Sequence, residues 1–62
     1  MKNGDKLINR NKPRERVYFD KVATRGGVET VFVDYIFSDS GKLRQDKRYI
    51  TPDDFASNYK MA

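Results

Sequence analysis

The sequence has no cysteine, no histidine and no tryptophan among its 62 residues. Without cysteine, neither a disulfide framework nor a thiolate metal site can stabilise the fold. Without histidine, the chain lacks the most common general base and the most common metal ligand. Catalysis at neutral pH would depend on Asp, Glu, Lys and Tyr alone, and no spacing among these residues indicates a catalytic or metal site. We therefore expect a protein that is not an enzyme and that binds no metal and no cofactor.

Long apolar runs are also missing. No stretch approaches the roughly 20 apolar residues that span a bilayer, and the start MKNGDKLINRN lacks the apolar run of a signal peptide. We expect a cytoplasmic protein without membrane association. The length predicts a single small domain over residues 1–62, which buries only about 60% of the surface that the unfolded chain exposes.

Positive charge exceeds negative charge along the chain. There are 13 Lys and Arg residues against 9 Asp and Glu residues, which gives a net charge of +4. Aromatic residues make up 13% of the chain, which argues against a disordered basic tail. A basic, aromatic, folded domain indicates an acidic partner, with nucleic acid as the first candidate. The alternative is that the charge only keeps the protein soluble.

Alternating apolar and polar residues predict strands at residues 4–8, 16–22, 29–37 and 42–50. Residues 9–15 are expected to form a loop, because they contain two Asn, one Pro and four charges. Val22 breaks the alternation of its strand, and a bulge near Asp20 and Lys21 would restore it. The 29–37 segment carries apolar residues on both faces, which favours a central position. The cation-rich 42–50 segment is predicted to be an edge strand.

The segment TPDDFASNYK predicts a short helix at about residues 52–59. Thr51 is a good N-cap, Pro52 suits the first helical position, and Asp54 completes a pattern like a capping box. Phe55 and Tyr59 are four residues apart and therefore share one helix face. Strands followed by a helix predict a mainly β fold with a short C-terminal helix. A strongly bent antiparallel meander in an SH3-like, partly open barrel is favoured, and an open antiparallel sheet with the helix on one face is the alternative.

The turn SDSG, at residues 38–41, leaves the register of the third and fourth strands open. A four-residue loop would pair Phe37 with Lys42, and a five-residue loop would pair Phe37 with Leu43. The second register adds Leu43 and Tyr49 to the face formed by Val31, Val33, Tyr35 and Phe37, and we favour it for that reason. It would place the cations Lys42, Arg44 and Arg48 beside Phe32 and Ile36 on the opposite face.

Apolar rings interleaved with cations can stack bases while the cations contact phosphates. Tyr18 is predicted to point away from the core beside Arg16, as an exposed tyrosine suited to recognition. The predicted nucleic-acid contacts are Arg16, Tyr18, Phe32, Lys42, Arg44 and Arg48. The alternative is that Phe55 and Tyr59 of the helix cover Phe32 and Ile36, which would leave the cations as a rim.

The NGDKL opening, the short β-rich body and the aromatic-containing C-terminal segment resemble small bacteriophage and prophage proteins with SH3-like barrels. The resemblance implies an accessory role in the bacterial cytoplasm, either contacting nucleic acid or modulating a host protein. The helix after Thr51 departs from such a barrel, in which a fifth strand closes the sheet. We therefore carry two hypotheses. The first is a small basic nucleic-acid-binding module, and the second is an interaction module or inhibitor that recognises an acidic host protein. An edge strand could also pair across a two-fold axis into a homodimer.

Overall fold

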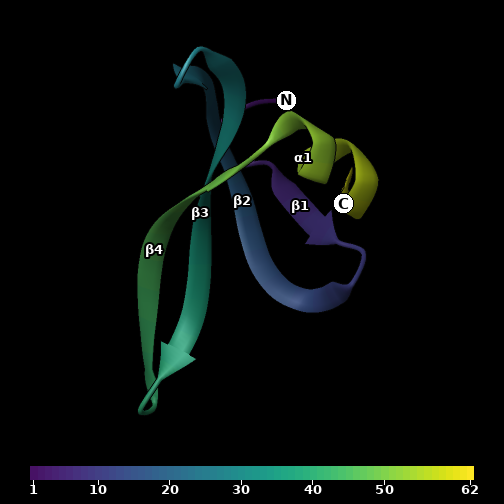
Figure 1. The fold of residues 1–62 in the computed structure, drawn as a ribbon. Helices are drawn as coiled ribbons and strands as arrows, with labels where there is room; N and C mark the ends of the chain where they lie inside the picture. The colour runs from purple at the N-terminus through teal and green to yellow at the C-terminus, as the bar shows by residue number, and fades with distance from the viewer.

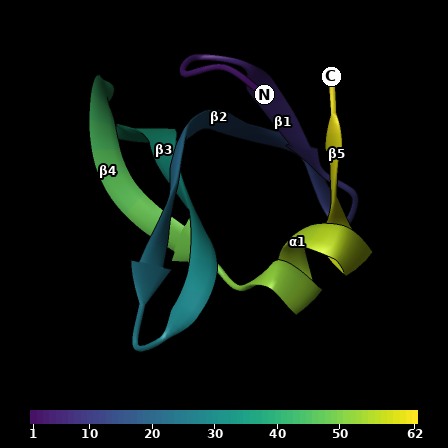
Figure 2. The same cartoon turned by 90° about the horizontal axis from the view of Figure 1, so that it is seen from above.

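The computed structural model describes all 62 residues as one bent antiparallel sheet with a short helix on one side (Figure 1 and Figure 2). The strand order is β4-β3-β2-β1-β5, so β4 and β5 are the two edges and the sheet is not closed into a barrel. The elements are β1 (Lys6–Asn9), β2 (Lys12–Arg25), β3 (Val28–Asp39), β4 (Lys42–Ile50), α1 (Pro52–Asn58) and β5 (Tyr59–Met61). The prediction of a mainly β fold with a short helix is confirmed, in the form of the open sheet.

β2 is longer than the sequence predicted, because it runs from Lys12 to Arg25 instead of from Arg16 to Val22. Its first residues curve away from β3 toward β1 (Figure 1), and Pro13 to Glu15 pair with neither neighbour. Pro13 is tolerated there because no ladder hydrogen bond needs its missing N–H. The predicted bulge is confirmed, since the register with β3 shifts between Phe19 and Lys21.

The turn between β3 and β4 has two residues, and both predicted registers are wrong. Ser40 and Gly41 have φ values of 52° and 79°, which defines a type I′ turn. This turn matches the twist of the strands, so Asp39 pairs with Lys42 and Phe37 pairs with Arg44. The favoured five-residue loop would have turned every β4 side chain to the wrong face. The four-residue loop keeps the faces but not the partners.

The sheet has one covered face and one uncovered face. The core face carries six buried apolar side chains: Leu7, Val17, Phe19, Val31, Val33 and Ile50. Phe55 of α1 and Tyr59 of β5 pack against this core. The expectation that the helix covers Phe32 and Ile36 is wrong, because these residues alternate with Val31 and Val33 and face the other way. We call their side of the sheet the open face.

The helix is built as its sequence predicts, but it ends one residue earlier. The Thr51 hydroxyl accepts a hydrogen bond from the Asp54 N–H at 3.3 Å, and Pro52 is the first helical residue. Tyr59 already has extended backbone and pairs with Asn9 in β1. The Phe55 and Tyr59 rings stack with centroids 6.2 Å apart. The strand β5 was not predicted, since three residues are too few to carry an alternation pattern.

Replacing Phe55 by alanine is expected to lower the free energy of unfolding by about 2 kcal/mol, because the ring is half-buried against the core. Urea denaturation followed by circular dichroism measures this change. Ser57→Ala is the control, since Ser57 lies on the exposed side of the same helix. Equal stability of the two variants would show that the helix contributes nothing to the core.

Hydrogen exchange along β4 is expected to alternate. A type I′ turn places the Asp39–Lys42 pair in mutual hydrogen bonding, so every even-numbered residue from 42 to 50 bonds to β3. The odd-numbered residues from 43 to 49 turn their N–H groups to the free edge. Exchange measured by NMR should be fast at the odd positions and slow at the interior even ones. Uniform protection would mean that the β4 edge is covered, for example by a second copy.

Candidate functional site

The six residues predicted to contact nucleic acid are divided between the two faces of the sheet. Arg16 and Tyr18 pair with Ile36 and Asp34, so they lie on the open face with Phe32. Lys42, Arg44 and Arg48 instead lie on the core-face side of β4, opposite Asp39, Phe37 and Val33. The prediction that these β4 cations lie beside Phe32 is therefore wrong. The outward position of Tyr18 is confirmed.

The arginines of β4 also form ion pairs with carboxylates of the same chain. Arg44 Nε lies 2.8 Å from an Asp39 carboxylate oxygen, and Arg48 Nε lies 3.6 Å from that of Asp46. The Arg48 guanidinium additionally stacks on the Tyr35 ring at 4.0 Å from its centroid. A guanidinium with a carboxylate partner offers less net charge to a phosphate. These two arginines are poor phosphate ligands for that reason.

One end of the open face holds a cluster of cations and aromatic rings that the sequence reading missed. Lys21, Phe32 and Tyr49 form one row across β2, β3 and β4. The Phe32 and Tyr49 rings lie 6.5 Å apart. Lys21 Nζ lies 5.7 Å from the centroid of the Phe32 ring, and the Arg25 guanidinium lies 3.8 Å from that of Tyr49. We call Lys21, Arg25, Phe32 and Tyr49 the cation–aromatic cluster.

The one sequence feature that points to this cluster is the predicted bulge in β2. The extra residue at Asp20 shifts the phase of β2, so Lys21 comes opposite Phe32. Tyr49 then joins the row only in the register that the two-residue turn sets. The sequence indicates the bulge but not the register between β3 and β4. The row of Lys21, Phe32 and Tyr49 could therefore not be predicted.

The middle of the open face holds two carboxylates that share one internal ammonium partner. Lys47 Nζ lies 2.8 Å from an Asp34 carboxylate oxygen and 3.2 Å from one of Asp20. The hydrogen bond from Lys47 holds the pKa of Asp34 below its ordinary value, although burial opposes this shift. The same contact with Asp34, followed by that with Asp20, raises the pKa of Lys47. One ammonium therefore bridges both carboxylates of this region, which leaves one excess negative charge there.

The remaining cations of the open face have no carboxylate partner. Strand alternation places Lys6 next to Tyr18 and Lys60 next to Ile8 on this side, and Arg25 reaches it through Tyr49. The open-face cations without an ion pair are Lys6, Arg16, Lys21, Arg25 and Lys60. These five unpaired cations outnumber the one excess negative charge left where Lys47 bridges Asp20 and Asp34, so this face is positive overall.

The core-face side has the opposite electrostatic character where the helix meets the sheet. A cleft of about 170 Å³ there is lined by Glu15, Tyr35, Arg48, Asp54 and Tyr59, among others. Burial raises the pKa of Tyr59, and the nearby carboxylates of Asp54 and Glu15 raise it further. Negative charge gathered at this cleft disfavours phosphate, so the open face is the better anion-binding surface.

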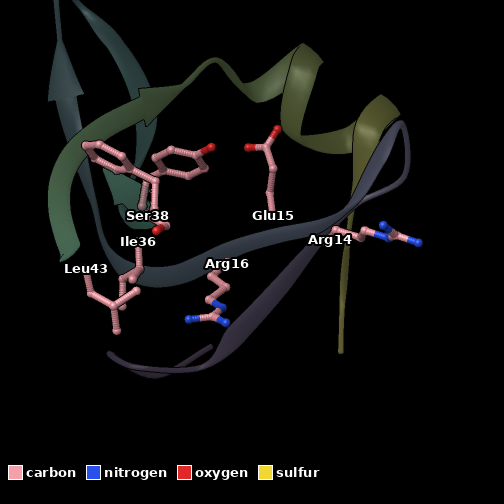
Figure 3. Close-up of a pocket in the computed structure, with 8 residues that line it drawn as sticks. Arg14, Glu15, Arg16, Ile36, Ser38 and Leu43 are labelled. Carbon is pink, nitrogen blue, oxygen red and sulfur yellow. The ribbon is translucent and has the colours of Figure 1, made fainter. Parts of the chain in front are cut away.

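A larger cavity of about 340 Å³ opens where β2 leaves β3. Arg16 lies on the same side of β2 as Ile36 and Leu43, whereas Glu15 points to the helix side (Figure 3). Leu43 is 68% exposed, the highest value among the exposed large apolar residues. This cavity combines an apolar floor with a cation at the far end of the sheet from the cation–aromatic cluster.

Comparison with known proteins finds no matching family model, no matching curated protein and no matching solved structure. The helix α1, with its seven residues, is too short to span a bilayer, and the chain has no other helix. Function is therefore inferred from the chain's own side chains.

The Asp34–Lys47 ion pair is expected to make the stability of the fold depend on pH in the acidic range. Because the pKa of Asp34 is lowered in the folded state, its stabilising effect is complete above the ordinary value of 3.8 and is lost as pH falls through the lower folded value. Asp34→Asn should therefore reduce the melting temperature at neutral pH, and the difference from the unchanged protein should shrink in acid. Asp46→Asn, at an exposed ion pair, is the control and should change little. A difference that persists unchanged below pH 3.8 would contradict the pairing.

Proposed function

We propose that the chain is a small basic nucleic-acid-binding module that uses its open face. The observation that carries this proposal is the set of unpaired cations interleaved with aromatic rings on the side that the helix leaves uncovered. Lys6, Arg16 and Lys21 are the proposed phosphate contacts. Tyr18 and Phe32 are the proposed sites of base contact between them.

The chemistry of the face suits a single strand. Splayed bases stack on aromatic rings without regard to sequence, while a cationic surface follows the backbone. Tyr18 and Phe32 are half-buried, so each ring is held in place but keeps some surface accessible. An arginine stacked on a tyrosine, as Arg25 is on Tyr49, keeps its N–H groups free at the ring edge for an anion. We therefore propose that binding is directed at phosphates and tolerates any sequence.

The proposed biological setting follows from the resemblance to phage and prophage proteins. It supports an accessory role in the cytoplasm of a bacterial host. A net charge of +4 supports weak binding, because only a few phosphates can be neutralised by so small a surface. Dissociation constants on the order of micromolar or weaker are expected at physiological salt.

Fluorescence anisotropy with labelled single-stranded and duplex oligonucleotides, at several salt concentrations, tests the proposal. Arg16→Ala combined with Lys21→Ala should weaken binding to all sequences and flatten the salt slope by up to about 1.4 units on a single strand. The matched control is Arg44→Ala combined with Arg48→Ala, which removes the same charge from the other face and should change the slope little. Equal losses in the two double variants would place the interface elsewhere. No binding at low salt would end the nucleic-acid proposal.

A further inference from the structure

Strand β3 continues beyond the point where its neighbour β2 leaves it. The last pair between the two strands is Arg16 with Ile36, whereas β3 pairs with β4 as far as Asp39. Residues Phe37 to Asp39 therefore have a strand partner on one side only. We call the gap between this end of β3 and the departing start of β2 the fork (Figure 1 and Figure 3).

The turn type determines which backbone groups face the fork. In a type I′ hairpin the Asp39–Lys42 pair is hydrogen bonded, so the next pair, Ser38–Leu43, is not. The N–H and C=O of Ser38 consequently point away from β4 and into the fork. The same alternation directs the backbone of Ile36 and Asp34 toward β2, and these are the residues that pair with Arg16 and Tyr18. At Ser38 the hydrogen-bond ladder between β3 and β2 has ended, although β3 itself continues to Asp39.

The side chains around the fork complement a particular ligand. Ile36 and Leu43 provide apolar surface on the open side of the cavity of about 340 Å³. Arg16 lies on that same side and has no ion pair within the chain (Figure 3). Glu15 is the one carboxylate lining the cavity, and it points to the opposite side, where Lys12 lies 3.9 Å away. The open side of the fork is therefore apolar and positive.

We propose that the fork binds a short extended peptide segment that carries an acidic and an apolar side chain two residues apart, on the same face of the segment. The segment adds to β3 where β2 would have continued, and its backbone pairs with the N–H and C=O of Ser38. Because side chains alternate along a strand, one face of the segment meets Ile36 and Leu43 and places a carboxylate near Arg16. A peptide suits these groups better than a nucleic acid does. Its backbone supplies both an acceptor for the Ser38 N–H and a donor for the Ser38 C=O. This site does not include the cation–aromatic cluster, shares only Arg16 with the proposed phosphate contacts, and does not depend on nucleic-acid binding.

The test uses the full chain and a displayed library of random peptides. Peptides are selected on the unchanged protein, and their affinities are then measured for a matched pair of variants. Ser38→Pro removes the N–H that faces the fork without removing any hydrogen bond to β4, because proline is tolerated where a strand N–H is unpaired. Ser38→Ala keeps that N–H and removes only the hydroxyl. Melting temperatures of both variants establish that they fold.

Selection should enrich sequences in which Asp or Glu lies two residues from Val, Ile or Leu. Ser38→Pro should weaken their binding by about tenfold or more, whereas Ser38→Ala should leave it unchanged. Selection on Arg16→Glu should enrich Lys and Arg at the acidic positions, and this arm tests the site even if the proline variant does not fold. Chemical shift changes in the unchanged protein should centre on Ile36, Ser38 and Leu43.

Three results would overturn the proposal. The first is the failure of any peptide to be enriched. The second is equal binding by the proline and alanine variants, which would show that strand addition is not involved. The third is displacement of the peptide by an oligonucleotide that shifts the amides of Ser38 and Leu43, which belong to the fork alone, because the fork would then belong to a nucleic-acid surface.

Discussion

The stacked rings of Phe55 and Tyr59 hold the C-terminal segment against the sheet, and the layout of both faces depends on that contact. The two rings belong to different elements, since Phe55 lies within α1 and Tyr59 begins β5. Together with Tyr35, they pack against the cluster of six buried apolar side chains. α1 is the one helix of these 62 residues, and it lies on the core side of the sheet. Phe32 and its neighbours therefore lie half-buried on the face that α1 does not cover, beside the unpaired cations.

The secondary structure could be read from the sequence because its signals are local. The N-cap at Thr51, the bulge near Asp20 and the edge character of β4 each depend on a few adjacent residues, and each is present in the structure. The start of β2 was misread for the same reason. Pro13 and its charged neighbours have a loop composition, but an unpaired stretch of strand makes the same demands on sequence as a loop.

The face of the sheet on which each β4 side chain lies could not be predicted in the same way, because it depends on the register that the β3–β4 turn sets. Ser38-Asp39-Ser40-Gly41 offers several loop lengths, and a change of one residue turns all of β4 over. Ser40 accepts a positive φ that is uncommon for a residue other than glycine, which makes the tightest loop possible. Of the six predicted contacts, the three on β2 and β3 remain together on the open face. The three on β4 were assigned through the register and lie on the other side.

The pairing of β5 with β1 has a consequence for how the chain folds. Leu7, the most deeply buried side chain, lies opposite Met61, so this contact joins residues from nearly the two ends of the sequence. The β2–β3 and β3–β4 hairpins are local and can form early, whereas β1 lacks its outer neighbour until the last strand arrives. Closing so long a loop costs entropy before any contact compensates for it. During synthesis the sheet therefore stays incomplete at β1 until residue 61 has left the ribosome.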